Sequence, residues 1–537
     1  MRDIMEKGVL LPPIVPQLSM EDVNNNKEKR LKSSDDDRQQ YQYINKKKTQ
    51  RYRRSKTSSS SSSSHIDNNS YQHRICFVCD FFYPKLGGVE THIWSLMQNL
   101  IKSGNKVILV THNYKDRVGI RYMTNALKVY YCPDFVFHDG ASFPNFFTFL
   151  PLFRNILIRE RIDIVHCHQA SSPLSHQCLL HANVMGIKTV YTDHSLFSFN
   201  DMAGIHLNKL LKMTLTGADA IICVSHTCRE NLVLRASLDP RHCSVIPNAV
   251  DSKMFQPNLT IHRSLIKDQN IINIVVVARL KYRKGIDIIA EAIPIICYRH
   301  YNVNFIIGGD GPKRILLEEM IEKYDLHDRV KLLGAVPHQE VPKVLNQGHI
   351  FLNCSLTESF CIAILEAASC GLYIVSTAVG GLPEVLPSNM ITLSDRVNSE
   401  SIVVALEEAM SKVRNINPLE FHKQISRMYR WEEVARRTVL VYDDLIFNKR
   451  KPRLINRILN YLRIGRFFGL LGVLLVSVDC IFLFILDYFF PANDVEIAKE
   501  VKFKDYVKYI RTNRDMGTLH KNTHHRNIKT SVGFNKE

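Results

Sequence analysis

Two glutamates bracket the most informative segment of the chain, Ser355-Leu-Thr-Glu-Ser-Phe-Cys-Ile-Ala-Ile-Leu-Glu-Ala-Ala-Ser-Cys-Gly371, in which seven residues separate Glu358 from Glu366. We expect Glu358 to lie in a Ser/Thr-rich loop and Glu366 to lie two turns into an Ala-rich helix. The residues after Glu358 would offer the unpaired backbone N–H groups of the first helical turn. These residues are Ser359, Phe360 and Cys361.

A carboxylate at each end of one helix can hold two separate hydroxylated parts of a single ligand. A nucleotide sugar has this form, with Glu358 near the sugar and Glu366 near the ribose. The alternative interpretation is a surface glutamate followed by an ordinary amphipathic helix.

A glycine-rich turn, Pro84-Lys-Leu-Gly-Gly-Val-Glu90, follows the first predicted strand. Gly87 and Gly88 would let the backbone approach a diphosphate, while the helix after them presents N–H donors. We include Glu90 among the predicted substrate-binding residues. The spacing is not G-x-G-x-x-G, which disfavours a nicotinamide or flavin. An ordinary turn is the alternative.

A basic loop, Ala278-Arg-Leu-Lys-Tyr-Arg-Lys-Gly285, follows the first strand of the second half. Arg279 and Lys284 could neutralise the two phosphates of a leaving nucleoside diphosphate. A solvated basic loop is the alternative, but the place of this loop at a strand's carboxyl end favours a binding role.

Two further segments lie at predicted strand ends. Ile307-Gly-Gly-Asp-Gly-Pro312 suits backbone contact with a base or phosphate, and it contributes Gly309, Asp310 and Gly311 to the predicted site. Thr192-Asp-His-Ser195 contributes His194, which would face the interdomain cleft. In isolation, such a histidine is more often structural, and its place at the cleft is what favours a binding role.

Short apolar runs alternate with helical stretches from Arg74 to about residue 445, which predicts parallel sheets covered by helices on both faces. The pattern restarts after Pro247–Asp251. We therefore expect two doubly wound α/β domains, at 74–250 and 251–448, with ligand in the cleft between them. Strands are predicted at 75–79, 106–111, 162–166, 188–192, 220–224 and 244–246, and then at 272–277, 304–307, 330–333, 350–352 and 373–375.

The 537-residue chain has a net charge of +18 and is long enough for two or three domains. Residues 1–73 are of low complexity and predict a disordered tail. Basic runs favour an anionic partner, and because no nucleic-acid-binding motif accompanies them, we expect a membrane and no nucleic acid. Thirteen scattered cysteines indicate reduced thiols in a cytosolic setting. No secretory signal is evident.

A basic segment at 449–466 precedes an apolar stretch at 467–490 and a basic tail at 491–537. At about 1.5 Å per residue, the apolar stretch can span a hydrocarbon core of about 30 Å. Asp479 and Asp487 weaken this prediction, because carboxylates in a membrane need polar partners. A buried helix of a soluble domain is the alternative. The basic flank predicts that residues before 467 are cytosolic, whereas the topology of 491–537 stays open.

Taken together, these segments resemble the retaining GT-B glycosyltransferases of family 4, over roughly residues 74 to 445. The combination of the E-x7-E and R-L-x-x-x-K-G segments carries the resemblance. The match is closer to the PIG-A family, the catalytic subunits of phosphatidylinositol N-acetylglucosaminyltransferase. The segments that carry it are Asp80–Pro84, Asp193–Phe197, Val245–Asp251, Tyr282–Asp287, Asn304–Gly309 and Gly348–Asn353. The long N-terminal tail departs from the family pattern but bears no motif.

The resemblance implies transfer of N-acetylglucosamine from UDP-GlcNAc to phosphatidylinositol with retention, the first step of GPI-anchor biosynthesis. It implies catalytic roles for Glu358, His194, Arg279 and Lys284. It implies substrate-binding roles for Gly87, Gly88, Glu90, Gly309, Asp310, Gly311, Ser359, Phe360, Cys361 and Glu366. No D-x-D segment stands at a predicted strand end and the cationic pair can replace a metal, so we expect a metal-independent enzyme without a cofactor.

The resemblance also implies partners and a location. The expected partners are phosphatidylinositol, the membrane and other subunits of a synthesis complex, with a single-pass anchor and catalytic domains on the cytosolic face of the endoplasmic reticulum. Two alternatives remain open. One is another family 4 lipid glycosyltransferase, such as a mannosyltransferase, and the other is a catalytically silent nucleotide-sugar-binding scaffold.

Overall fold

The structure is a computed structural model that describes residues 72–500, except 86, 116, 139, 197–201 and 262–270. Nearly all of the predicted N-terminal tail and the part of the C-terminal tail beyond residue 500 therefore lie outside the described residues. Phe197, part of one segment that carries the resemblance, also lies outside them.

The first sheet has eight strands in the order β10-β9-β8-β7-β1-β2-β4-β3, and only its edge strand β3 is antiparallel. In chain order the strands are β1 (Arg74–Val78), β2 (Lys106–His112), β3 (Gly119–Met123), β4 (Leu127–Cys132), β7 (Ile164–His168), β8 (Lys188–Asp193), β9 (Ala220–Cys223) and β10 (Cys243–Val245). A separate hairpin pairs β5 (Val136–His138) with β6 (Ala141–Ser142).

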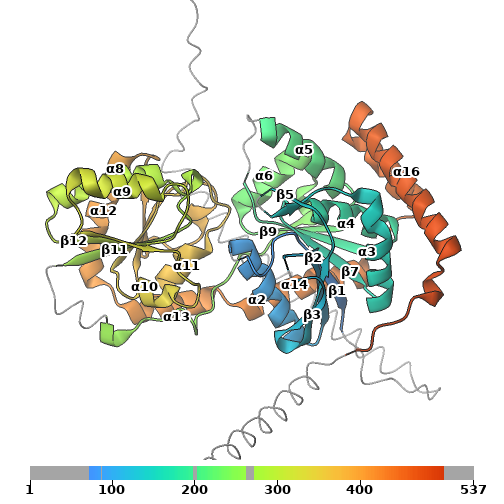
Figure 1. The fold of residues 1–537 in the computed structure, drawn as a ribbon, viewed down its shortest axis with the longest axis horizontal. Coiled ribbons are helices and arrows are strands. Elements are labelled where there is room, and N and C mark those ends of the chain that lie inside the picture. The colour runs from blue at the N-terminus through green and yellow to red at the C-terminus, as the bar shows by residue number, and fades with distance from the viewer. Residues whose placement is uncertain are drawn as a thin grey trace, which may run out of the picture. The chain divides into compact units, whose positions relative to one another are not determined.

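Helices cover both faces of this sheet (Figure 1). One layer holds α3 (Phe146–Glu160), α4 (Pro173–Val184), α5 (Met202–Leu215) and α6 (His226–Ala236). On the other side α2 (Gly88–Lys102) packs against α14 (Trp431–Asp443). By sequence, α14 falls in the range 251–448 predicted for the second domain, yet its Tyr442 hydroxyl bonds Nδ1 of His166 on β7, at 2.6 Å.

The second sheet has six parallel strands in the order β13-β12-β11-β14-β15-β16. They are β11 (Ile272–Val277), β12 (Val303–Gly308), β13 (Val330–Gly334), β14 (Ile350–Asn353), β15 (Tyr373–Thr377) and β16 (Ile391–Ser394). Its helices are α8 (Ile286–Arg299), α9 (Arg314–Tyr324), α10 (Val341–Leu345), α11 (Ile362–Ser369), α12 (Ser399–Lys412) and α13 (Pro418–Met428). In Figure 1, α8, α9 and α12 lie on one side of the strands and α10, α11 and α13 lie on the other.

The predicted fold class, two doubly wound α/β sheets, is confirmed, and its strands form because their apolar runs are buried on both faces. The sequence did not predict β3, β4 or β16. The run of β4 contains Lys128, a residue type that is rarely buried. Here Lys128 is buried because its ammonium bonds Oε1 of Glu160 at 2.6 Å.

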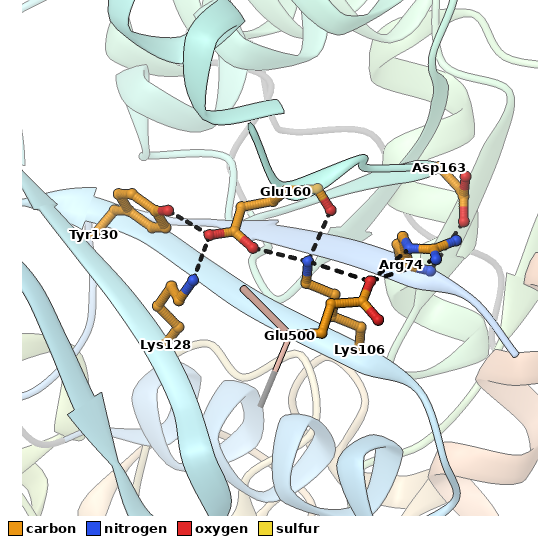
Figure 2. A network of polar contacts seen from close by, with 7 residues as sticks. All are labelled: Arg74, Lys106, Lys128, Tyr130, Glu160, Asp163 and Glu500. Carbon is orange, nitrogen blue, oxygen red and sulfur yellow. Dashed lines mark hydrogen bonds and ion pairs between the residues drawn. The ribbon is translucent and has the colours of Figure 1, made fainter. Parts of the chain in front are cut away.

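Glu160 is the centre of a buried polar network at the end of α3 (Figure 2). Its carboxylate accepts from Lys128 and from the Tyr130 hydroxyl at 2.5 Å, and it forms an ion pair with Lys106 at 2.9 Å. Burial favours its neutral form, but these donors outweigh burial and lower the pKa of Glu160 below its ordinary value. The network therefore joins β2 and β4 to α3 through one charged side chain.

The described chain ends with α15 (Leu454–Asn460), the turn η7 (Tyr461–Ile464) and the long apolar helix α16 (Arg466–Phe489). Among the described residues, α16 is the one helix long and apolar enough to cross a membrane. It packs against α4 and α5 of the first sheet.

Candidate active site

An ion pair between Lys284 and Glu358 lies at the carboxyl edge of the second sheet. Lys284 follows β11 and Glu358 follows β14, and these two strands are neighbours. The Lys284 ammonium bonds Oε1 of Glu358, which also accepts from the Ser355 hydroxyl at 2.9 Å. Burial lowers the pKa of Lys284, but the charge of Glu358 outweighs burial and leaves that pKa above its ordinary value. The Lys284 ammonium therefore keeps its positive charge.

Gly285 is needed for this contact. Its φ is +66°, and a Cβ there would stand 1.8 Å from the carbonyl oxygen of Cys354. The turn that carries Lys284 thus presses directly on the end of β14, which brings the ammonium to Glu358. Arg279 is exposed in the same loop, and its positive charge acts against that of Lys284.

The helix after Glu358 begins later than the sequence predicted. α11 starts at Ile362, so Ser359 and Phe360 precede it and Glu366 is little more than one turn inside it. Cys361 occupies the capping position with a φ of +65°, a conformation that is uncommon for a residue other than glycine. The N–H groups of the first helical turn therefore belong to residues from Ile362 onward and not to 359–361.

Ser359 and Phe360 instead fix the loop. The Ser359 hydroxyl donates to the carbonyl oxygen of His194 at 2.5 Å, and the buried Phe360 ring packs edge-on against Tyr429, with 5.9 Å between ring centroids. Ser359 thus connects the Glu358 loop to the segment that follows β8.

A Gly-Gly pair that was not predicted from the sequence lies against the Glu358 backbone. Gly381 donates its N–H to the Glu358 carbonyl at 2.9 Å, and Gly380 has a φ of +55°. A Cβ on Gly380 would lie 2.1 Å from that same carbonyl oxygen. The signal was present, because these glycines follow β15 just as other predicted glycine turns follow strands.

Glu366 has a partner that was also missed. Its Oε1 atom lies 3.1 Å from Nε2 of His338. This hydrogen bond outweighs burial and raises the pKa of His338 above its ordinary value. The predicted ribose-binding carboxylate is therefore held in place by an imidazole.

The predicted glycine-rich strand end supports the Arg279 loop. Gly309 and Gly311 have φ values of +146° and +152°, and Cβ atoms there would lie 1.8 Å from the Ala278 carbonyl and 2.6 Å from the Leu280 carbonyl. The Asp310 carbonyl accepts the Leu280 N–H at 2.9 Å. These glycines thus let the two loops pack at backbone distance, while the predicted ligand contacts stay predictions.

The Gly87-Gly88 turn opens α2 as expected. Gly88 is the first residue of the helix, and a Cβ there would meet no other atom within 4 Å, whereas Gly87 is extended. A Cβ on Gly87 would lie 2.5 Å from Oε2 of Glu90, so that carboxylate lies directly over the glycine backbone.

His194 belongs to a histidine cluster. Its Nε2 lies 3.1 Å from Nδ1 of His168, and its ring meets that of His92 edge-on at 4.5 Å. Nδ1 of His92 in turn bonds Oδ1 of Asn248 at 2.7 Å, and the His92 ring also contacts Trp431. Of these histidines, only His194 was predicted from the sequence. The H-x-H spacing at the end of β7 was a signal for His168.

These imidazoles are held neutral. Burial lowers the pKa of His92 to about 4, and burial together with the neighbouring histidines lowers the pKa values of His168 and His194 well below their ordinary range. The Nε2 atoms of His92 and His168 are buried without a hydrogen-bond partner among the described residues. As neutral imidazoles they can accept a hydrogen bond, whereas their lowered pKa values disfavour taking up a proton near neutral pH.

The same three histidines have a metal-compatible arrangement, since one ring nitrogen of each lies within 4.8 Å of the others. Within the described part of the chain, they are the only group of three or more potential ligands so placed. The expected metal independence stays a prediction.

Comparison with known proteins places these residues in a family. Residues 112–201 match the family described as PIGA (GPI anchor biosynthesis), and residues 258–425 match Glycosyl transferases group 1. A phosphatidylinositol N-acetylglucosaminyltransferase subunit from Arabidopsis thaliana is 46% identical over 464 residues, covering 86% of this chain and 98% of the relative. The chain belongs to the PIGA family.

Two further relatives support membership of the PIGA family at similar identity. The corresponding subunit from Homo sapiens is 48% identical over 435 residues, which cover 79% of this chain and 87% of that protein. The gpi3 subunit of Schizosaccharomyces pombe is 48% identical over 423 residues, covering 78% of this chain and 91% of that protein. All three relatives are named as subunits of phosphatidylinositol N-acetylglucosaminyltransferase.

Solved structures show the GT-B fold of this PIGA family member. Sucrose-phosphate synthase from Thermosynechococcus elongatus matches with a TM-score of 0.60 at 18% identity, covering 70% of this chain and all of that one. HepE from Anabaena, solved with UDP and glucose, matches with a TM-score of 0.54 at 16% identity and the same 70% coverage of this chain. At these identities the likeness concerns the fold alone.

Proposed function

We propose that the chain transfers N-acetylglucosamine from UDP-GlcNAc to the inositol of phosphatidylinositol and releases UDP. The names of its PIGA relatives, which describe a phosphatidylinositol N-acetylglucosaminyltransferase, support the proposal. The observation that carries the proposal is the charged Lys284–Glu358 pair, positioned by neighbouring strands inside the glycosyltransferase match at 258–425. This reaction is the first step of GPI-anchor biosynthesis.

The chemistry demands stabilisation of negative charge on the departing diphosphate. Two positive charges come from one loop: Arg279 is exposed, and Lys284 is half-buried. The Gly87-Gly88 backbone at the start of α2 would add N–H donors. Removal of one such donor typically costs about 3 kcal/mol of barrier.

The sugar and the ribose would be held by the two glutamates. Glu358, oriented by Ser355 and Lys284, would accept from sugar hydroxyls, with Ser359, Phe360 and Cys361 fixing its loop. Glu366, held by His338, would accept from the ribose hydroxyls. Gly309, Asp310 and Gly311 would complete the nucleotide side, and Glu90 lies over the Gly87 backbone.

His194 would contact the sugar or the departing phosphate as a neutral imidazole, since its pKa is well below its ordinary range. In a retaining transfer of this type the acceptor attacks from the leaving group's side, so a covalent nucleophile is not required. Because Arg279 and Lys284 can offset the diphosphate charge, the proposed reaction is metal-independent.

The acceptor is a lipid, and α16 supplies a single apolar anchor beside the first sheet. We propose that the anchor holds both sheets at the cytosolic face of the endoplasmic reticulum. The names of the relatives describe subunits, so we also propose that the chain works with other subunits of a GlcNAc-phosphatidylinositol synthesis complex.

The test is product formation in microsomes that express this chain in cells lacking their own PIGA member. Radiolabelled UDP-GlcNAc and phosphatidylinositol are expected to yield radiolabelled GlcNAc-phosphatidylinositol. Glu358→Gln should abolish most of the signal. Glu408→Gln, which alters an exposed carboxylate paired with Lys412 on α12, serves as the matched control. Normal product formation by Glu358→Gln would overturn the site assignment.

A further inference from the structure

The long helix α16 has two different apolar faces. A stripe with spacing of three and four residues is buried against the protein, and it consists of Gly469, Gly472, Val476, Asp479, Leu483 and Leu486. The opposite stripe is exposed, and it includes Phe467, Leu470, Leu474, Val478, Ile481 and Ile485. One side of the helix is covered by the protein core, which accounts for its apolar residues. The exposed apolar side needs a different apolar environment.

The middle of α16 is fixed to the first sheet's helices by a buried polar contact. Asp479 is 1% exposed, and both of its carboxylate oxygens lie 3.0 Å from Nδ1 of His181 on α4. The other nitrogen of His181 lies 3.0 Å from the carbonyl oxygen of Phe146 on α3. The carboxylate that weakened the membrane prediction therefore has its partner within the chain.

The segment before α16 is fixed to the same α/β domain. The Lys451 ammonium pairs with Asp219 at 3.1 Å, and the Asn460 side chain donates to the Thr216 carbonyl at 3.1 Å. Lys188, the first residue of β8, donates to the carbonyl oxygen of Lys449 at 2.8 Å.

The segment after α16 returns to that domain as well. Nε of Arg154 on α3 donates to Asp487 at 3.0 Å, and the Ala498 N–H donates to the Arg159 carbonyl at 2.9 Å. Glu500 pairs with Arg74 at 3.4 Å, where β1 begins (Figure 2). The segments on both sides of α16, as well as its middle, are therefore fixed to the same domain.

These contacts conflict with a spanning orientation. At about 1.5 Å per residue, the 24 residues of α16 extend about 36 Å, enough to cross a hydrocarbon core of about 30 Å. A crossing helix would place its two ends on opposite sides of the bilayer. Here both ends contact one α/β domain, which stays on one side.

We infer that α16 does not cross the membrane but lies along it, with its exposed stripe in the cytosolic leaflet and residues 490–500 on the same side as the two sheets. The single-pass orientation predicted from the sequence is thereby replaced by a one-leaflet anchor. The inference rests on the proposed membrane anchoring and not on the transfer reaction.

The residues of α15, the helix that precedes α16, support the proposal that the exposed stripe of α16 contacts a lipid surface. On α15, Leu454, Ile455 and Leu459 are exposed. Exposed Arg453 and Arg463 flank them in sequence. Apolar side chains beside arginines are what a helix at an anionic bilayer interface presents, because burial in the acyl region and attraction to headgroups add together.

The test uses full-length chains with one added cysteine each, in sealed microsomes whose cytosolic face points outward. Arg450→Cys reports on the exposed position before α16, and Lys499→Cys reports on the exposed position after it. A membrane-impermeant maleimide is added with and without detergent. The unsubstituted chain controls for its own cysteines, of which all but Cys361 and Cys480 are buried. A lumenal protein of the same microsomes shows that they are sealed.

We expect both added cysteines to be modified to the same extent before detergent is added. Modification of Lys499→Cys only after detergent, with Arg450→Cys modified before it, would overturn the inference and restore a spanning helix. Release of the chain from the microsomes by a high-salt wash would overturn the anchoring proposal and this inference with it. Absence of GlcNAc transfer by the unsubstituted chain, with the expected labelling of both added cysteines, would contradict the proposed reaction alone and leave the one-leaflet orientation supported.

Discussion

Lys284 donates to Oε1 of Glu358, so a predicted phosphate-binding cation and the predicted sugar-binding carboxylate are partners of one another. A donor diphosphate would compete with Glu358 for this ammonium. Binding of UDP-GlcNAc would then exchange one anionic partner of Lys284 for another and release Glu358 toward the sugar. In the proposed reaction, the pair would thereby couple phosphate binding to sugar binding.

Substitution of Lys284 by methionine is predicted to slow transfer strongly. Loss of one preorganised donor at a developing negative charge should lower kcat/KM by about 100- to 1,000-fold. The measurement is the initial rate of GlcNAc-phosphatidylinositol formation at several UDP-GlcNAc concentrations. Lys313→Met removes a comparable nearby ion pair, with Asp287 at 2.6 Å, and should retain most activity. Equal losses in the two variants would contradict the role of Lys284.

His338 is predicted to give a stability contribution that fades as pH rises. Its hydrogen bond to Glu366 raises its pKa above the ordinary value of 6.5. The contribution is therefore fully present below pH 6.5 and is lost as pH rises through the raised pKa of the folded state. The unfolding temperatures of the parent chain and His338→Gln should differ most at acidic pH and converge at alkaline pH. A constant difference across this range would rule out the linkage.

The sequence could place Lys284 and Glu358 in one site because of strand geometry, although it did not predict that they form an ion pair. Both residues follow short apolar runs, and carboxyl ends of parallel strands meet at one edge. The helix start at Ile362 could not be predicted in this way. It depends on Cys361 adopting a φ of +65°, and a residue other than glycine gives no sign of such a conformation.

The histidine cluster was only partly predictable, because His92 lies on α2, far in sequence from His168 and His194. A histidine on an apolar helix face indicates an ordinary core residue until the tertiary contact is known. The packing of α16 was missed for a related reason. Its buried and exposed stripes are both apolar, so the sequence pattern does not separate a protein-facing side from a lipid-facing side.

His92 is predicted to make the chain sensitive to acid. Burial lowers its folded pKa to about 4, whereas the ordinary value is 6.5. The unfolded state therefore binds the proton first, and stability is lost as pH falls from 6.5 toward about 4. His92→Gln should lose less stability over this interval, as measured by the unfolding temperature. His327→Gln alters an exposed histidine and should follow the parent chain. An identical acid response of the two variants would contradict the prediction.

Substitution of the buried Glu160 carboxylate on α3 is predicted to destabilise the fold. Glu160→Gln leaves the ammonium groups of Lys106 and Lys128 without their buried counter-charge, which should destabilise the fold by about 3–5 kcal/mol. The measurement is the free energy of unfolding in urea, or resistance to proteolysis where unfolding is irreversible. Glu408→Gln, at an exposed ion pair, should change stability by about 0–1 kcal/mol.

A triple variant tests whether Glu160→Gln destabilises the fold by leaving buried charges unpaired or by disturbing the packing around residue 160. In Lys106→Met/Lys128→Met/Glu160→Leu all three charges are replaced by apolar side chains, so no buried charge is left unpaired. It should therefore be more stable than Glu160→Gln although it carries more changes. The pKa of Glu160 is lowered in the folded state, so the parent chain loses this contribution as pH falls below 4.5 and through that lowered value, whereas the triple variant lacks this loss. A triple variant less stable than Glu160→Gln would mean that packing around β2 and β4, and not charge compensation, accounts for the network.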